Sequence, residues 1–359
     1  MSGIYVHIPY CRQKCIYCDF YSTASRQSRT AYIAALKLEA IQRKDYLLTP
    51  VRTMYFGGGT PTVLTRTEVE DIYNRLSSVF DLSNCVETTI EANPENLSGE
   101  YLSFLRRLGF NRLSIGIQSF DPDDLRVLNR RHSCQQATES VRMAKEQGFD
   151  NISIDLMFNL PGMNMEKWKE NLDKALQLDV EHISCYSLTM EKGTMLDKMI
   201  KAGKTSLPND EECIRQFNAA DEILTRNGYR HYEISNYCKV GKESIHNSSY
   251  WQQTDYIGLG ASAHSFNKTS RQWNPSSIEQ YINNINTCTE AEKEILSDKD
   301  KYNEYIMLSL RTEKGTDITH IKKHFPQFLS HYEKQLEKVS DMISDRWILS
   351  NRIAVELML

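Results

Sequence analysis

Three cysteines, Cys11, Cys15 and Cys18, stand within eight residues near the start of the chain. Three thiolates on one short loop can bind three irons of a cubane [4Fe-4S] cluster and leave the fourth iron without a protein ligand. S-adenosylmethionine (SAM) can bind that open iron through its amino and carboxylate groups, and an electron from the cluster then cleaves the sulfonium to give a 5′-deoxyadenosyl radical. The spacing therefore predicts a cluster that binds SAM.

Two other kinds of site also use closely spaced cysteines. A structural zinc ion needs a fourth ligand, and the loop offers no further Cys or His before Tyr21. Cys15 and Cys18 alone have the spacing of a thioredoxin-like dithiol, but this interpretation leaves Cys11 unexplained. An iron–sulfur cluster is therefore favoured, with a zinc-binding structural protein as an alternative.

The elements that must position this loop alternate between short apolar runs and longer amphipathic segments. Strands are predicted at 4–8, 54–56, 87–91, 112–118, 151–158 and 182–188, and helices at 30–44, 66–80, 98–108, 135–147, 165–178 and 210–227. Six such repeats predict an α/β protein with parallel strands in a barrel or an open sheet. In both arrangements the chemistry lies at the carboxyl ends of the strands.

Polar residues and glycines gather where these strands end. The sequence GGGTP at 57–61 follows the second strand, where glycines let the backbone approach a ligand closely. Glu91, Gln118, Arg130 and Asp155 lie at or near the ends of later strands, and Arg130 can pair with a carboxylate through two hydrogen bonds. We expect these residues to share one rim with the cysteine loop and to form a SAM site.

The composition excludes several classes of protein. The other six cysteines are scattered singly and the total of nine is odd, which does not fit a disulfide framework. A net charge of −4 without a long run of Lys or Arg argues against a nucleic-acid partner. No stretch approaches the ~20 apolar residues of a transmembrane segment, and no targeting leader is recognised. We expect a soluble, cytoplasmic protein with a small-molecule partner.

A change in sequence character near residue 290 predicts two domains. Residues 1–290 contain the α/β repeats, and residues 291–359 are expected to form a smaller, mainly helical, winged-helix-like domain. From Asp298 onward this segment holds ten Lys plus Arg and ten Asp plus Glu, so it lacks the basic face that phosphate binding needs. It is expected to serve as a lid or packing domain.

The segment His246-Asn247-Ser-Ser-Tyr250-Trp251 joins an imidazole to two large aromatic rings. Such a set can ligate heme iron and cover a porphyrin face. A loop histidine is more often a plain hydrogen-bonding residue, so the segment alone does not decide the matter. The remaining isolated histidines show no paired ligand spacing and are expected to be structural, namely His7, His132, His182, His231, His320, His324 and His331.

Several longer stretches resemble one known family. They are Gly3-Ile-Tyr5-Val-His7-Ile-Pro9-Tyr-Cys11, GGGTP, Glu91-Ala-Asn-Pro-Glu95, Ile117-Gln118-Ser-Phe120, the segment 246–251 and the segment 258–265. Together they resemble the oxygen-independent coproporphyrinogen III oxidase family of radical SAM proteins. The resemblance implies a partial (β/α)6 TIM-like radical SAM barrel. It also implies SAM contacts at Tyr5, Tyr17, Gly58, Gly59, Thr60, Glu91, Gln118, Arg130, Asp155, Ser187 and His264.

Two departures from that family point to one of its branches. The true oxidases carry a further cysteine at the second position after the triad, where this chain has Phe20, and they have an N-terminal extension before the first strand. Both departures and the HNxxYW segment are similar to the heme chaperone (HemW-like) branch, whose members bind heme and are thought to deliver it to acceptor proteins. This resemblance implies heme contacts at His246, Asn247, Tyr250 and Trp251.

Two functions follow from these resemblances as expectations. The first is a heme-binding chaperone that carries a SAM-liganded [4Fe-4S] cluster and transfers heme to an acceptor protein. The alternative is a radical SAM oxidoreductase that acts on coproporphyrinogen III or another tetrapyrrole. No catalytic residue is assigned, and the sequence does not predict the acceptor or the oligomeric state.

Overall fold

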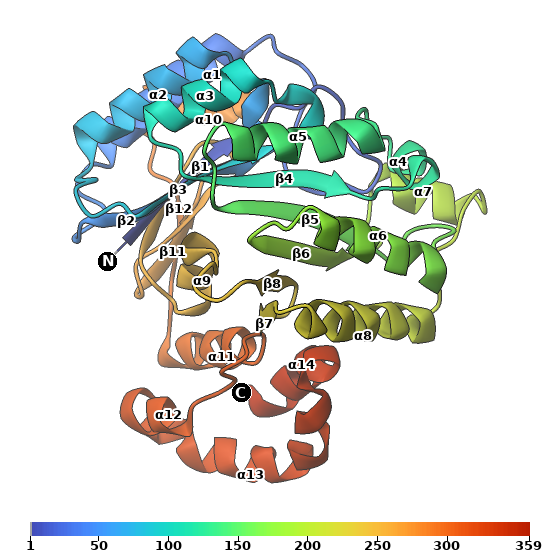
Figure 1. Ribbon diagram of the computed structural model, residues 1–359. Coiled ribbons are helices and arrows are strands. Elements are labelled where there is room, and N and C mark those ends of the chain that lie inside the picture. Colours follow the sequence, from blue (N-terminus) through green and yellow to red (C-terminus); the bar gives the residue numbers. More distant parts are fainter. Residues whose placement is uncertain (1) are drawn as a thin grey trace.

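Six parallel strands, paired in the order in which they occur in the sequence, form the centre of the molecule (Figure 1). The computed structural model describes residues 2–359, apart from the side chains at positions 344 and 346. The strands are β1 (Ser2–Ile8), β2 (Val51–Gly58), β3 (Glu87–Ala92), β4 (Arg112–Gln118), β5 (Ile152–Phe158) and β6 (His182–Ser187). Each pairs in parallel with the next, which confirms the predicted α/β class and partial (β/α)6 barrel.

Helices connect these strands and cover the outside of the sheet. They are α1 (Arg29–Gln42), α2 (Arg66–Val79), α3 (Gly99–Leu108), α4 (Pro122–Val127), α5 (Cys134–Glu146), α6 (Met165–Gln177), α7 (Met195–Lys201) and α8 (Asp210–Arg226). Local signals set their starts: Thr65 and Glu68 form a capping box at α2, and Ser133 and Gln136 form another at α5. The helices bury apolar faces against the strands in one large core.

The sheet continues beyond the six predicted strands at both edges. Next to β6 lie β8 (Asn236–Cys238) and β7 (Arg230–Glu233), both antiparallel to their neighbours. On the other side β9 (Tyr256–Leu259) runs parallel to β1, and β10 (His264–Phe266), β11 (Ser270–Trp273) and β12 (Glu292–Ile295) follow as antiparallel strands. These strands are three or four residues long, too short for an alternating pattern to reveal them in the sequence.

A buried carboxylate attaches this extension to the barrel. Glu39 on α1 is fully buried, and its Oε2 accepts hydrogen bonds from the Gly260 amide at 2.8 Å and the Tyr281 hydroxyl at 2.7 Å. Its Oε1 accepts from Asn274 at 2.8 Å and pairs with Arg43 at 3.0 Å. Because every lone-pair direction of Glu39 is used, α1, β9 and α10 (Ile278–Asn286) are fixed relative to one another.

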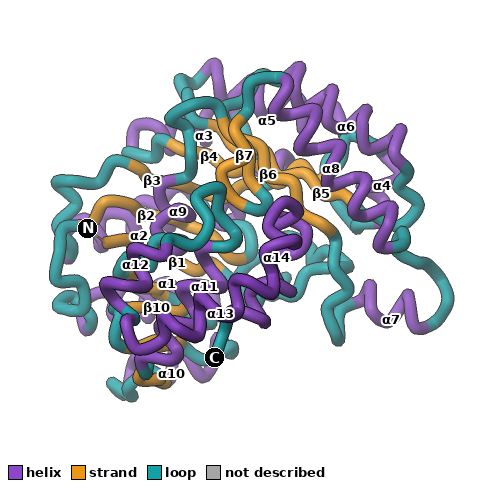
Figure 2. Tube along the Cα trace, turned by 90° about the horizontal axis from the view of Figure 1, so that it is seen from below, coloured by secondary structure: helices purple, strands orange, loops and turns teal. Residues whose placement is uncertain are grey.

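The C-terminal helices enclose a second, smaller core. They are α11 (Asp298–Ser309), α12 (Ile318–His324), α13 (Leu329–Val339) and α14 (Arg346–Leu357), and they pack around Tyr302, Ile306, Ile321 and Ile353. Figure 2, seen from below, places these helices together on the side nearest the viewer. Since β12 lies beyond residue 290 and pairs with β11, we propose that the domains divide at 296–297. The described residues from 297 onward form helices, apart from one isolated antiparallel bridge between Thr312 and Glu233, and the likeness to a winged helix stays a prediction.

None of the helices in the described part of the chain combines the length and the apolar character that crossing a lipid bilayer requires.

Candidate functional site

The cysteine loop leaves β1 and is held at both ends by backbone hydrogen bonds. At its base the Cys11 amide donates to the Thr23 carbonyl at 2.9 Å, and the Thr23 amide donates to Pro9 at 2.7 Å. On the far side the Leu196 amide of α7 donates to the Ile16 carbonyl at 2.9 Å. The loop is therefore fixed over the carboxyl ends of the strands.

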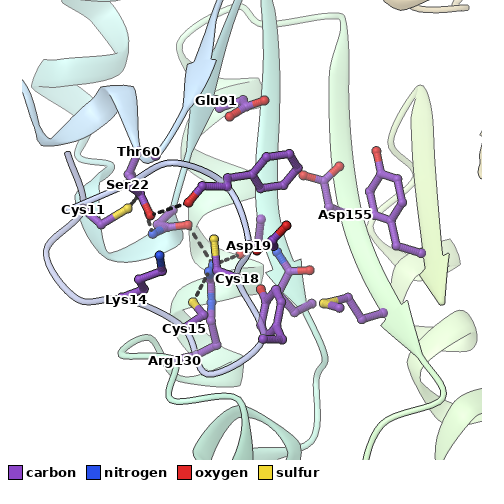
Figure 3. A pocket seen from close by; sticks show the side chains of 18 of the residues that line it. Cys11, Lys14, Cys15, Cys18, Asp19, Ser22, Thr60, Glu91, Arg130 and Asp155 are labelled. Atoms are coloured by element: carbon purple, nitrogen blue, oxygen red, sulfur yellow. Dashed lines mark hydrogen bonds between the residues drawn. The ribbon is translucent and has the colours of Figure 1, made fainter. Parts of the chain in front are cut away.

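All three cysteines of the triad line one cavity of about 580 Å³ at this rim. Figure 3 shows the side chains of Cys11, Cys15 and Cys18 on the same stretch of loop, next to Thr60 and Arg130. The cavity has the size of a small-molecule site. The other predicted SAM contacts that line it are Tyr17, Gly58, Gly59, Thr60, Glu91, Gln118, Arg130, Asp155 and Ser187.

The donor set of the cavity fits an iron–sulfur cluster. Burial raises the pKa of the Cys11 and Cys18 thiols, so binding iron as thiolates releases protons. A guanidinium Nη1 of Arg130 lies 3.5 Å from the Cys15 sulfur, and the Thr60 hydroxyl lies 3.5 Å from the Cys11 sulfur. Both donors stabilise negative charge on sulfur.

The thiols do not form a site for a single metal ion. Over residues 2–359 no three His, Cys, Asp or Glu side chains converge closely enough to hold one ion. In a cubane each thiolate binds a different iron, so a cluster does not require such convergence. The arrangement therefore suits a cluster better than the zinc ion considered as an alternative.

The GGGTP segment packs directly against the strand and loop that carry the cysteines. The Gly59 amide donates to the Ile8 carbonyl at 2.8 Å, and the Thr60 amide donates to the Tyr10 carbonyl at 2.9 Å. Gly58 has φ +107°, and a Cβ there would lie 2.6 Å from the His7 ring. Glycine is required at this position by both the backbone conformation and the close approach.

Glu91 and Asp155 place two carboxyl groups on the wall of the cavity. Glu91 accepts hydrogen bonds from the Tyr55 hydroxyl at 2.8 Å and from the Gly58 amide at 3.1 Å. Burial raises the pKa of Glu91 to about 7, against the opposing effect of the Tyr55 hydrogen bond, and the charge of Asp155 raises it further. Burial also raises the pKa of Asp155, which accepts a hydrogen bond from Ser114. Such carboxyl groups suit ligand hydroxyls or amino groups.

Arg130 reaches the cavity from the segment after α4. Its Nη2 donates to Asn93 Oδ1 at 2.8 Å and to the carbonyl of Gly116, which fixes the guanidinium across the ends of β3 and β4. Gln118 ends β4 with φ +68°, the left-handed conformation that glycine and asparagine adopt more readily. Both predicted residues therefore lie at the rim, as the strand pattern indicates.

Two residues assigned to SAM by resemblance do not line the cavity. The Tyr5 hydroxyl bonds to His7 Nδ1 at 3.1 Å inside the barrel, and the Tyr5 ring stacks on Tyr55. His264 lies exposed on β10, where its ring stacks on Trp273 at 6.0 Å. The SAM contacts proposed for Tyr5 and His264 are thus not supported by their positions here.

Several lining residues escaped the sequence analysis, among them Lys14, Asn93, Ser114, Gly116 and Tyr186. A signal for two of them exists: Ser114 and Gly116 stand four and two residues before Gln118, so they share its face of β4.

The HNxxYW segment is a helix rather than a loop, and it lies at the opposite end of the barrel. It forms α9 (Ile245–Trp251), which the Ser244 side chain caps by accepting from the Asn247 amide. His246 is 0% exposed, its Nδ1 lies 2.8 Å from the Thr53 hydroxyl, and its Nε2 lies 2.8 Å from the Tyr250 hydroxyl. Both ring nitrogens are therefore already hydrogen-bonded.

Buried groups hold α9 against the amino-terminal ends of β2 and β3. The backbone amides of Ile245 and His246 donate to the Glu87 carboxylate at 2.9 and 2.8 Å. Burial lowers the pKa of His246 to about 3, so the imidazole is neutral at physiological pH. The His246 ring stacks on Tyr55 at 5.0 Å, and Tyr55 also binds Glu91, so this one side chain touches both α9 and the cofactor cavity.

Comparison with known proteins agrees with this geometry. The radical SAM superfamily matches residues 5–175 of the chain. The heme chaperone HemW of Lactococcus lactis is 34% identical over 99% of this chain and 93% of its own length. The heme chaperone HemW of Bacillus subtilis is 37% identical over 79% of this chain and 76% of its own length. The chain belongs to the HemW family of radical SAM proteins.

The fold of this HemW family member is also that of a solved enzyme. Coproporphyrinogen III oxidase (HemN) from Escherichia coli, a radical SAM enzyme, superposes with a TM-score of 0.85 and covers 99% of this chain and 90% of its own. The sequence identity is 22%, so the comparison bears on the fold alone.

The triad gives this HemW family member a direct test of cluster binding. We expect Cys15→Ser to prevent cluster assembly, because the radical SAM arrangement leaves only three protein sulfurs for four irons. Iron and acid-labile sulfide analysis after anaerobic reconstitution measures the loss. Cys288→Ser is the matched control, since Cys288 is exposed and lies outside the cavity. Equal iron contents in Cys15→Ser and the wild type would contradict the assignment.

The burial of His246 in this HemW family member predicts a structural cost for its removal. His246→Ala leaves a cavity and deprives Thr53 and Tyr250 of their partner, so we expect the free energy of unfolding to fall by about 2–4 kcal/mol. Urea denaturation measures the change. The exposed His264→Ala should stay within about 0.5 kcal/mol of the wild type. An unfolding free energy unchanged in His246→Ala would mean that α9 is not packed as described.

Proposed function

We propose that this chain is a heme-binding chaperone that carries a SAM-liganded [4Fe-4S] cluster and passes heme to an acceptor protein. Membership of the HemW family supports the proposal, because relatives at 34% and 37% identity carry the name heme chaperone HemW. The main observation in favour of this proposal concerns Phe20, which stands where the oxidases have a fourth cysteine. Phe20 lines the cavity and is 72% exposed, so an aromatic ring replaces a thiol at the mouth.

In this proposal the residues of the rim hold the two cofactors. Cys11, Cys15 and Cys18 would bind the cluster, which when bound supplies an electron and an open iron for SAM. The GGGTP backbone, Glu91 and Arg130 would orient SAM, with the guanidinium suited to a carboxylate and Glu91 to donor groups. Further SAM contacts are proposed at Tyr17, Gln118, Asp155 and Ser187, which line the same cavity.

Heme contact is proposed for α9, through His246, Asn247, Tyr250 and Trp251. The last three are partly exposed, whereas His246 is buried with both ring nitrogens engaged. Coordination of iron by His246 therefore requires α9 to move and the bonds to Thr53 and Tyr250 to break. A chaperone that must release its cargo is compatible with a ligand that has an alternative partner in the protein.

One anaerobic sample tests the proposal. The reconstituted protein is titrated with hemin, SAM binding is measured, and 5′-deoxyadenosine is assayed after addition of a reductant. We expect a shift of the heme absorption band that is diminished in a Trp251→Ala variant, which spares the buried network of His246. A sample that binds SAM but shows no spectral change with hemin would overturn the heme assignment and leave the cofactor site standing.

The second candidate is a radical SAM enzyme that acts on coproporphyrinogen III or another tetrapyrrole. It is favoured by a complete triad and a cavity with the lining expected for SAM. Anaerobic incubation with coproporphyrinogen III and a reductant separates the two: formation of protoporphyrinogen IX with 5′-deoxyadenosine would favour the enzyme. A time course without product would eliminate it.

We also place the protein in the cytoplasm. All nine cysteines are unpaired over the described residues, and free thiols and an iron–sulfur cluster suit a reducing compartment. The acceptor of heme would be another protein of that compartment.

A further inference from the structure

Two histidines outside the cofactor site form a pair on the C-terminal helices. His320 and His324 stand four residues apart on α12, and their ring centroids are 4.4 Å apart. The expectation that these two histidines lack a paired spacing therefore does not hold. Residues four apart on a helix lie on the same face one turn apart, which brings two imidazoles within reach of one ion.

The ring nitrogens of this pair are available. Among the described residues no hydrogen bond or ion pair engages His320 or His324, whereas His7, His182, His231 and His246 each have both ring nitrogens bonded. His324 is exposed and His320 is partly exposed. The pair is thus the one place in the described chain where two free imidazoles adjoin each other.

An aromatic neighbour holds one member of the pair in place. The Tyr305 ring of α11 stacks on His320 at 4.2 Å with an interplanar angle of 14°, and the Tyr305 hydroxyl is fixed by the Asp317 backbone amide at 2.9 Å. His320 is therefore restrained before a ligand arrives, which reduces the entropy lost on binding. His324 is exposed, so its side chain has room to turn toward the same ion.

Two lysines lie between the members of the pair in the sequence. Lys322 and Lys323 are exposed and can turn into solvent.

We propose that His320 and His324 chelate one divalent transition-metal ion of the Ni²⁺, Cu²⁺ or Zn²⁺ type. Imidazole nitrogen is a preferred ligand of these ions, and water would complete the coordination because no third protein ligand is present among the described residues. Heme iron does not suit the pair, since a porphyrin fills the equatorial positions and leaves no two adjacent positions for ligands from one helix. Both overall views place α12 at the edge of the C-terminal helices (Figures 1 and 2).

Retention on nickel–nitrilotriacetate resin tests the chelate, because this complex leaves two adjacent coordination positions open. The protein is untagged and cluster-loaded, which occupies the thiols of the triad, and is kept anaerobic. We expect the wild type to be retained, and His324→Ala to elute with at least about 10²-fold weaker binding, because one imidazole cannot bind both positions. His320→Asn should behave in the same way, and His264→Ala, which removes an exposed but single histidine, should elute with the wild type.

Two measurements keep the test independent of folding and of heme. Urea denaturation must give the same midpoint for His324→Ala and the wild type, as expected for an exposed side chain. Hemin titration of the variant should match the wild type, so a failure of the heme proposal is distinguishable from a failure of this one. Elution of His324→Ala together with the wild type would overturn the chelate.

Discussion

Gly59→Ala is expected to weaken SAM binding by up to about 100-fold. A Cβ at this position would lie 2.9 Å from the Ile8 carbonyl oxygen, the Pro9 carbonyl carbon and the Tyr10 carbonyl oxygen. All three are backbone atoms of the segment that leads into the cysteine loop, so no flexible side chain can give way. Overpacking of this kind costs about 1–3 kcal/mol or more, and 3 kcal/mol corresponds to roughly a 100-fold change in affinity.

Equilibrium binding of SAM to reconstituted protein measures the effect of Gly59→Ala, and iron analysis shows whether the loop still assembles the cluster. Gly99→Ala is the matched control, because the nearest atom to its Cβ is the Gln147 side chain at an ordinary 3.8 Å and Gly99 stands in a helix. The control should bind SAM as the wild type does. If the affinity of Gly59→Ala for SAM lies within about threefold of that of the wild type, the backbone around Gly59 can shift to accommodate a Cβ at little cost.

Glu91→Gln is expected to remove part of the pH dependence of stability of the cofactor-free protein. The pKa of Glu91 is about 7 in the folded chain and near 4.5 in an exposed carboxyl, so between these values the folded state holds a proton that the unfolded state has lost. The contribution of Glu91 to the free energy of unfolding therefore falls as the pH rises from about 4.5 to 7, and it is constant above pH 7. For a pKa difference of about 2.5 units at about 1.4 kcal/mol per unit, the loss attributable to Glu91 amounts to about 3.5 kcal/mol.

Urea denaturation at pH 5.5 and pH 8 measures this difference for the wild type and for Glu91→Gln. The wild type should lose more stability between the two pH values than the variant does. Glu233→Gln provides a control, since burial also raises the pKa of Glu233 to about 7 but this residue lies outside the cavity. Glu233→Gln should reduce the pH dependence and leave SAM binding intact, whereas Glu91→Gln should impair both. Parallel pH profiles for Glu91→Gln and the wild type would refute the raised pKa.

The barrel could be predicted from the sequence because its signals are local. Strand 112–118 has the same bounds in the structure, and the predicted helix 66–80 begins at Arg66 because Thr65 and Glu68 form a capping box. The position of the site at one rim could also be predicted, because the carboxyl ends of parallel strands meet on one side of the sheet. The triad, the GGGTP segment, Glu91 and Arg130 accordingly line one cavity.

The environment of His246 could not be predicted, because its partners are distant in the sequence. Thr53 precedes it by 193 residues, and Glu87 by 159. Nothing in the segment 246–251 indicates that its imidazole is buried against polar groups inside the barrel. A local signal for the helix was present, since Ser244 is a favourable N-cap, but the irregular composition around it concealed that signal. The short strands β7–β12 were missed for the same reason, since their pairing depends on the barrel already being formed.

The position of α9 bears on which end of the barrel a ligand can use to enter and leave. Because hydrogen bonds to Thr53 and Glu87 hold α9 over the amino-terminal ends of β2 and β3, a molecule bound in the cavity would enter and leave at the other end, past Lys14 and Phe20. Heme bound at α9 would therefore lie at the opposite end from SAM and would leave SAM free to exchange through this mouth.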